Sequence, residues 1–184
     1  QLVAHIARDD LSKTSERLRR LRVKDLVVPR EPSSLTGAAE FGFRHVLIRD
    51  VAYESLPKRD RAALHREIGE WAEQELSDRL DEFAELIASH FSAAVAYEEE
   101  FDLTGGPRLA GLRTQARDAA VRAARRAWSM SQFGAANRWL RLAIDLAWKT
   151  ELPVRDIADL ALEFDEIAFM VGSEPDQVAF AQRA

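Results

Sequence analysis

The chain has 184 residues, no cysteine, a hydrophobic content of 47% and a formal net charge of −5. This composition suits one large globular domain or two small ones, with enough apolar residues for ordinary cores. The lack of cysteine excludes disulfides and thiolate zinc sites and favours a reducing compartment, so the predicted location is the cytoplasm. With no apolar run of about 18 residues, we expect no membrane partner. The chain starts at Gln1 and its only methionines are Met130 and Met170, so we expect it to be part of a longer protein.

Charge alternates along the chain in blocks. Residues 70–102 hold eleven acids against a single base, Arg79, whereas residues 103–149 hold nine bases against two acids. Residues 1–30 are basic and residues 150–184 are acidic. We expect successive elements to face one another with opposite charge, each exposed ion pair contributing about 0 to 1 kcal/mol.

The first predicted elements are a basic helix and a strand. The capping side chains of Asp9–Ser12 precede a helix that runs from about Lys13 to Lys24. Leu26–Val28 then has the composition of a strand. We expect Pro29 to end this strand, because proline has no backbone donor.

A hairpin and another helix follow. Residues 30–40, REPSSLTGAAE, are polar and rich in Ser, Gly and Pro, which suits a hairpin tip. Phe41–His45 would form the returning strand, and from Val46 the apolar residues take helical spacing until Pro57 ends the helix. The order helix, strand, long loop, strand is typical of the second half of a winged helix.

The basic helix carries a group of cations that could contact the phosphates of DNA. These are Arg17, Arg19, Arg20, Arg22 and Lys24. The same residues also fit the solvated face of an ordinary surface helix. DNA binding by a winged-helix transcription factor is therefore kept as the alternative function.

Residues 43–66, FRHVLIRDVAYESLPKRDRAALHR, resemble the junction between the winged-helix domain and the following helical segment of bacterial STAND-type signal-transduction ATPases. The similarity is to multidomain regulators that join such an ATPase to an adenylate or guanylate cyclase or a LuxR-type domain and to tetratricopeptide repeats. The similarity rests on the segments FRH, LIRDVAYESL and ALHR. The chain contains no nucleotide-binding fingerprint of its own.

The resemblance implies a role for His45. In such ATPases a Met-His-Asp-Leu run opens the matching helix, and its histidine contacts the β-phosphate of bound ADP. Arg44–Leu47 is similar in pattern, although Val46 stands where the family places Asp. An imidazole can donate a hydrogen bond to a phosphate. The other interpretation of His45 is a strand-end histidine satisfied by the backbone.

Two more helices are predicted before a linker. They cover Lys58–Leu76 and about Leu80–Ala94, with Ser77 or Asp78 as the cap of the second. His65 and His90 lie beside their apolar stripes without a second ligand at i+3 or i+4, so we expect packing and no metal site.

The tract from Tyr97 to Pro107 is predicted to be the linker. Its acidic first part, up to Asp102, is expected to be a solvated, frayed turn, because the glycines and proline that follow end helices. A domain boundary is placed near residue 105.

The last part of the chain is predicted to form antiparallel helix pairs. The helices 109–129 and 133–147 resemble a degenerate tetratricopeptide repeat, with a small-residue face on the first. A second pair would begin at about Val154 and turn at Gly172–Pro175. Its solvated stripe would hold Asp156, Asp159, Glu163 and Glu166.

The sequence therefore predicts a mainly α fold. It would comprise a partial winged helix with a short β-hairpin (1–56), a helical connector (57–104) and tetratricopeptide-like helix pairs (105–184). We expect a non-catalytic regulatory fragment without a cofactor of its own. The resemblance to STAND-type ATPases implies a parent protein that binds ATP or ADP and is itself an ATPase, an adenylate or guanylate cyclase, or both. The fragment would relay the nucleotide state to a repeat array that binds proteins or neighbouring domains, not nucleic acid. The exposed repeat end would favour self-association.

Overall fold

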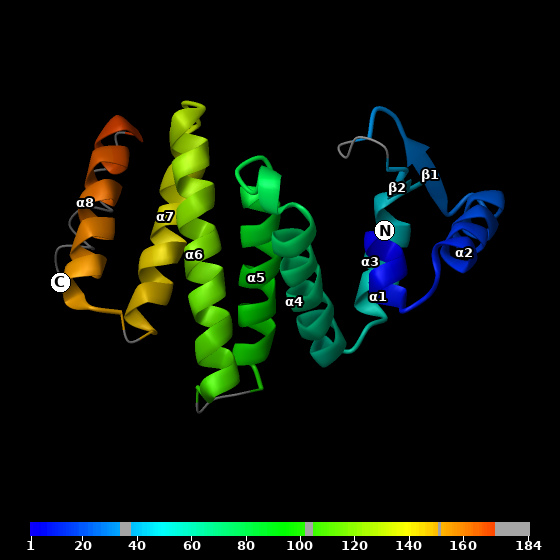
Figure 1. Cartoon of the computed structure of the whole chain (residues 1–184), viewed down its shortest axis with the longest axis horizontal. Helices are drawn as coiled ribbons and strands as arrows, with labels where there is room; N and C mark the ends of the chain where they lie inside the picture. Colours follow the sequence, from blue (N-terminus) through cyan, green and yellow to red (C-terminus); the bar gives the residue numbers. More distant parts are fainter. Residues whose placement is uncertain (34–37, 102–104, 151, 172–184) are drawn as a thin grey trace. The chain divides into compact units, whose positions relative to one another are not determined.

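The computed structural model describes residues 1–33, 38–101, 105–150 and 152–171. Within these residues there are eight α-helices, one short 3-10 helix and one two-stranded antiparallel sheet (Figure 1). The predicted mainly α fold with a short β-hairpin is thus confirmed. No described helix is both long and apolar enough to cross a bilayer. The chain divides into two compact units, 1–64 and 65–184. The boundaries predicted at residues 57 and 105 stay predictions.

The N-terminal unit begins with two short helices and a hairpin. Its elements are α1 (Leu2–Ala7), α2 (Leu11–Val23), β1 (Val27–Arg30), β2 (Glu40–Phe43) and α3 (Val46–Glu54). Helix α2 starts where Asp10 caps it, because the Asp10 carboxylate accepts a hydrogen bond of 2.8 Å from the Lys13 backbone N–H. Strand β2 ends at Phe43, two residues before the end predicted for it at His45.

The hairpin corrects one expectation. Pro29 does not end β1: it lies inside the strand, opposite Phe41, and the ladder continues to the pair Arg30 and Glu40. Both strands are edges of a two-stranded sheet, and an edge strand tolerates a residue without a backbone N–H. The tip residues 34–37 lie outside the described residues.

Few apolar side chains are buried in this unit before α4 (Lys58–Glu75), the helix that contains the boundary between the two units in the sequence. Ala4 and Val27 are buried, whereas α3 has no buried residue. On α3, Val46, Leu47 and Val51 are exposed. The unit is therefore held mainly by caps, the β-ladder and local contacts.

The C-terminal unit is a succession of packed helices. After the rest of α4 come the 3-10 helix η1 (Ser77–Arg79), α5 (Ala84–Glu99), α6 (Pro107–Ser129), α7 (Phe133–Trp148) and α8 (Val154–Val171). The predicted small-residue face of α6 is confirmed, and all its members are buried: Ala116, Ala119, Ala120, Ala123, Ala124 and Ala127. Small side chains let α5 and α7 approach the α6 backbone closely, so this face forms the centre of the core.

Helix α6 contacts helices two places away in the chain as well as its immediate neighbours. Arg122 of α6 pairs with Glu73 of α4, and Arg125 of α6 pairs with Glu163 of α8 at 2.9 Å. Lys149, which follows α7, pairs with Glu99 of α5 at 3.0 Å. The helices of this unit therefore alternate between two rows, α4–α6–α8 and α5–α7.

The start of α5 and the predicted linker differ from expectation. Helix α5 begins at Ala84, not near Leu80, and Phe83 precedes it without a side-chain capping hydrogen bond. The turn that precedes α5 is instead stabilised by the ion pair of Arg79 with Glu82. At the other end, residues 97–99 belong to α5 and are not a frayed turn.

Arginines of α6 explain why α5 extends to Glu99. Arg108 and Arg113 hold Glu98 and Glu99 of the last α5 turn. Burial raises the pKa of Glu99, but hydrogen bonds from Lys149 and Arg113 outweigh this and hold the pKa below its usual value. The charge blocks seen in the sequence thus meet at this end of the unit.

Candidate functional site

His45 lies where the sequence placed it, at the entry to α3. Its backbone is extended, with φ −133° and ψ 144°, and its carbonyl accepts hydrogen bonds from the N–H groups of Ile48 and Arg49. The exposed imidazole makes no capping hydrogen bond. The side chain therefore stands beside the amino end of a helix, where partial positive charge favours anions.

The cations predicted to contact DNA are exposed on α2, but three of them already have acidic partners. Arg17 pairs with Asp9 at 2.6 Å, and Arg19 and Arg20 both pair with Glu16. Hydrogen bonds from Arg19, and then from Arg20, lower the pKa of Glu16 to about 2. Arg22 and Lys24 are exposed near the end of α2. The basic surface is thus partly neutralised by Asp9, which precedes α2, and by Glu16 within it.

Two histidines that the sequence treated as isolated meet between α4 and α5. The Nδ1 atoms of His65 and His90 are 2.9 Å apart and the ring centroids 5.0 Å apart, so one imidazole donates a hydrogen bond to the other. The ring of Tyr97 stacks on His65 with centroids 6.1 Å apart. Only the packing of α4 on α5 joins these residues, which no sequence spacing could reveal.

Both histidines are half-buried, which disfavours their charged forms. Burial lowers the pKa of His65. Burial, and then the charge of His65, lower the pKa of His90 to about 4. Across the described ranges, no three metal-binding side chains gather as a metal site would require. The pair is therefore a neutral, proton-sensitive contact.

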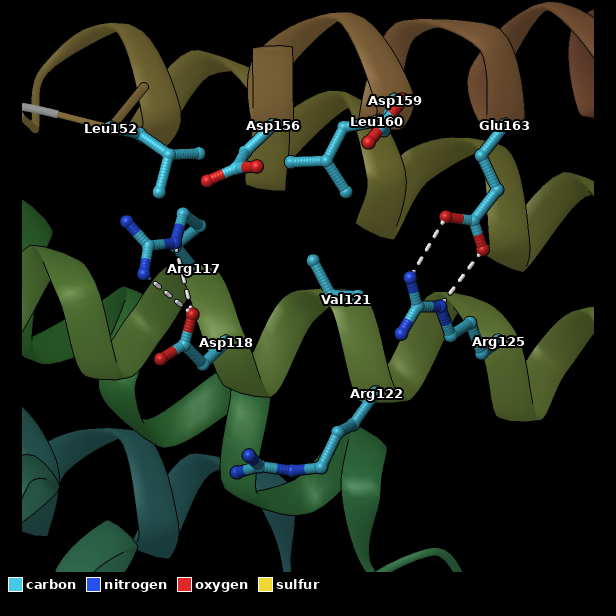
Figure 2. A pocket seen from close by; sticks show the side chains of 10 residues that line it. All are labelled: Arg117, Asp118, Val121, Arg122, Arg125, Leu152, Asp156, Asp159, Leu160 and Glu163. Atoms are coloured by element: carbon cyan, nitrogen blue, oxygen red, sulfur yellow. Dashed lines mark hydrogen bonds and ion pairs between the residues drawn. The ribbon is translucent and has the colours of Figure 1, made fainter. Parts of the chain in front are cut away.

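A cavity of about 380 Å³ opens between α6 and α8 (Figure 2). From α6 it is lined by Arg117, Asp118, Val121, Arg122 and Arg125. From α8 and the turn before it, the lining is Leu152, Asp156, Asp159, Leu160 and Glu163. Apolar side chains from both helices thus lie among charged groups of both signs. We call this cavity the α6–α8 groove.

The arginines of the groove are all engaged by protein groups. Arg117 pairs with Asp118 at 2.8 Å and donates to the Thr150 hydroxyl at 3.1 Å. Arg122 extends away from α8 in Figure 2, toward its partner on α4. Arg125 forms two hydrogen bonds with Glu163. The prediction that Glu163 belongs to a solvated acidic stripe is therefore wrong for this carboxylate.

The remaining acids of the predicted α8 stripe behave differently. Asp156 and Asp159 are exposed and line the groove, and their carboxylates have no hydrogen-bond or ion-pair partner among the described residues. The side chain of Glu166 lies outside the described residues. Sequence reasoning found the acidic stripe, but not the groove, because the groove requires α8 to lie beside α6.

Comparison of the chain with protein-family models, with curated proteins and with solved structures gives no match.

Proposed function

We propose that the chain is a non-catalytic regulatory part of a multidomain, ATP-dependent signalling protein, in which α4 to α8 form a protein-binding helical array. One observation carries this proposal. Helix α6 packs against α5 and α7 and forms ion pairs with α4 and α8, and an open groove lies between α6 and α8. Stacked helix pairs of this kind present extended surfaces to partners.

The α6 and α7 pair supports a tetratricopeptide-like repeat. The two helices are joined by only three residues, 130–132, so they run antiparallel. Ala124 of α6 and Ala136 and Ala143 of α7 are small residues, and all three are buried. The second helix of the next pair would lie in residues 172–184, outside the described residues.

The N-terminal unit would report the nucleotide state of the parent protein. We propose that His45 contacts a phosphate of ADP held by another part of that protein, and that α3 and α4 pass the change to the array. The exposure of His45 at the start of α3 supports this role. In the full-length parent, His45→Ala should weaken ADP binding measured by calorimetry, whereas unchanged affinity would remove the sensor role.

The protein-binding function is tested by selecting peptides from a random phage-displayed library on the whole chain. Val121→Trp serves as the comparison, because Val121 is half-buried in the groove and a Trp side chain would fill it without changing charge. We expect enriched peptides that bind the wild type and lose binding to the variant. Failure to enrich any groove-dependent peptide would contradict the proposal. Circular dichroism checks that Val121→Trp is folded. A second variant that fills the groove, Leu152→Trp, should lose peptide binding in the same way.

The exposed cations of α2 keep DNA binding as a second candidate. Fluorescence anisotropy of a labelled duplex, measured between 50 and 200 mM salt, separates the two functions, because phosphate contacts make affinity fall steeply with salt. Under our proposal the chain does not bind the DNA duplex specifically. Strong salt-dependent binding that is lost in the Arg22→Ala, Lys24→Ala double variant would favour the alternative.

A further inference from the structure

The α6–α8 groove has an uneven charge. Each of its three arginines is already matched by a carboxylate, namely Asp118, Glu73 or Glu163. The carboxylates of Asp156 and Asp159 remain without a partner in the part of the chain that the structure describes. The groove therefore presents two uncompensated negative charges to whatever enters it.

The two carboxylates are placed to act together. They are three residues apart on α8, and side chains with this spacing lie on the same face of a helix. Figure 2 shows Asp156 reaching into the groove beside Leu152 and Leu160. Leu160 is buried, while Leu152 and Val121 are half-buried, so apolar surface lies next to the charge.

We propose that the groove binds an extended basic segment of a partner protein. A Lys or Arg side chain of that segment pairs with Asp156 and Asp159, and a neighbouring apolar side chain packs on Leu152 and Leu160. This inference rests on the proposed protein-binding function and names the chemistry of its partner. An acidic segment is disfavoured, because it would have to displace a carboxylate that already holds an arginine.

The test uses two fluorescein-labelled peptides, GSKLRVKSG and its charge-reversed counterpart GSELEVESG, titrated into the whole chain by fluorescence polarisation. We expect the basic peptide to bind and the acidic one not to bind. The double variant Asp156→Asn, Asp159→Asn should weaken the basic peptide about 2- to 30-fold, the effect of losing two exposed ion pairs.

A matched control comes from two exposed carboxylates that do not line the groove. The double variant Asp145→Asn, Asp165→Asn changes the net charge equally and should leave the affinity unchanged. An equal loss in both double variants would mean general attraction to an acidic chain and would overturn the inference. Circular dichroism of each variant checks that α8 is retained.

The inference and the proposed function fail in distinguishable ways. If the library selection yields groove-dependent peptides that lack Lys and Arg and ignore Asp156→Asn, Asp159→Asn, the basic partner is wrong while the protein-binding function stands. If selection yields no groove-dependent peptide and neither probe binds, both are wrong. Tighter binding of GSELEVESG than of GSKLRVKSG would reverse the assigned partner charge.

Discussion

The two compact units differ in how they use similar amphipathic helices. Helix α3 in the N-terminal unit buries none of its residues, and Leu47 at its start is 73% exposed. In the C-terminal unit, α6 alone has eight buried residues, and Phe91 of α5 is 0% exposed. An apolar stripe therefore stabilises a helix only where a neighbour covers it, since burial supplies about 25 cal/mol per Å² of apolar surface.

The difference in stability between the units can be followed with two spectroscopic signals. All four tryptophans of the chain lie after residue 70, so tryptophan fluorescence reports on the C-terminal unit alone. Circular dichroism reports on the helices of both units. Comparing the two signals during urea unfolding assigns a loss of stability to one unit or the other.

The largest expected effect is the removal of a buried aromatic side chain. Phe91→Ala should lower the free energy of unfolding of the C-terminal unit by about 3–5 kcal/mol, because the ring loses its burial and leaves a cavity. Leu47→Ala, the matched change in the N-terminal unit, should cost no more than about 0.5 kcal/mol. Urea unfolding measures both, and equal costs would show that α3 is covered in solution.

Close approach between α4 and α5 gives the next effect. A Cβ on Gly69 would lie 2.8 Å from the Phe91 ring, and that ring cannot move aside because it is fully buried. Gly69→Ala should therefore destabilise the unit by about 1–3 kcal/mol, even though alanine favours helix. Gly111 of α6 has open space around it. Gly111→Ala should stabilise by about 0.5–1 kcal/mol, and a stabilising Gly69→Ala would contradict the tight packing.

Acid should weaken the C-terminal unit through His65 and His90. The pKa of His90 falls from its ordinary 6.5 to about 4 in the folded chain. Between these two pH values the folded state therefore binds fewer protons than the unfolded state. The contribution is fully present above pH 6.5 and is lost as pH falls toward 4. Allowing for the solvent that reaches the half-buried rings, it amounts to roughly 1–2 kcal/mol.

Burial and the charge of His65 are the two causes that lower the pKa of His90. Helices α4, α5 and α6 also carry ion pairs, such as Glu73 with Arg122, but these do not contribute to the shift. The double variant His65→Gln, His90→Gln should lose this pH dependence, while His45→Gln should keep it. Tryptophan-detected unfolding between pH 7 and 4 tests this, and identical pH profiles would rule out the pair as the cause.

The smallest expected effect concerns the ion pair that joins α6 to α8. Arg125 and Glu163 are partly exposed, so their coupling energy should be only about 0.2–1 kcal/mol. A double-mutant cycle with Arg125→Ala and Glu163→Ala measures it. A coupling above this range would mean that the contact is desolvated and holds the groove in shape.

Local sequence determined much of this fold. Capping by Asp10, the break at Pro57 and the spacing of apolar residues locate α2, α3, α4, α6 and α7 to within a few residues, because these signals depend only on neighbours in the chain. The hairpin and the position of His45 at the start of α3 follow from the same local rules.

Tertiary structure decided the rest. Whether a stripe is buried, as on α6, or exposed, as on α3, depends on which helix lies against it, and no local pattern contains that information. The contact of His65 with His90, and the groove that Asp156 shares with α6, join residues 25 or more positions apart. These sites arise from helix packing, in which long-range burial and charge pairing select one arrangement among many that the same stripes permit.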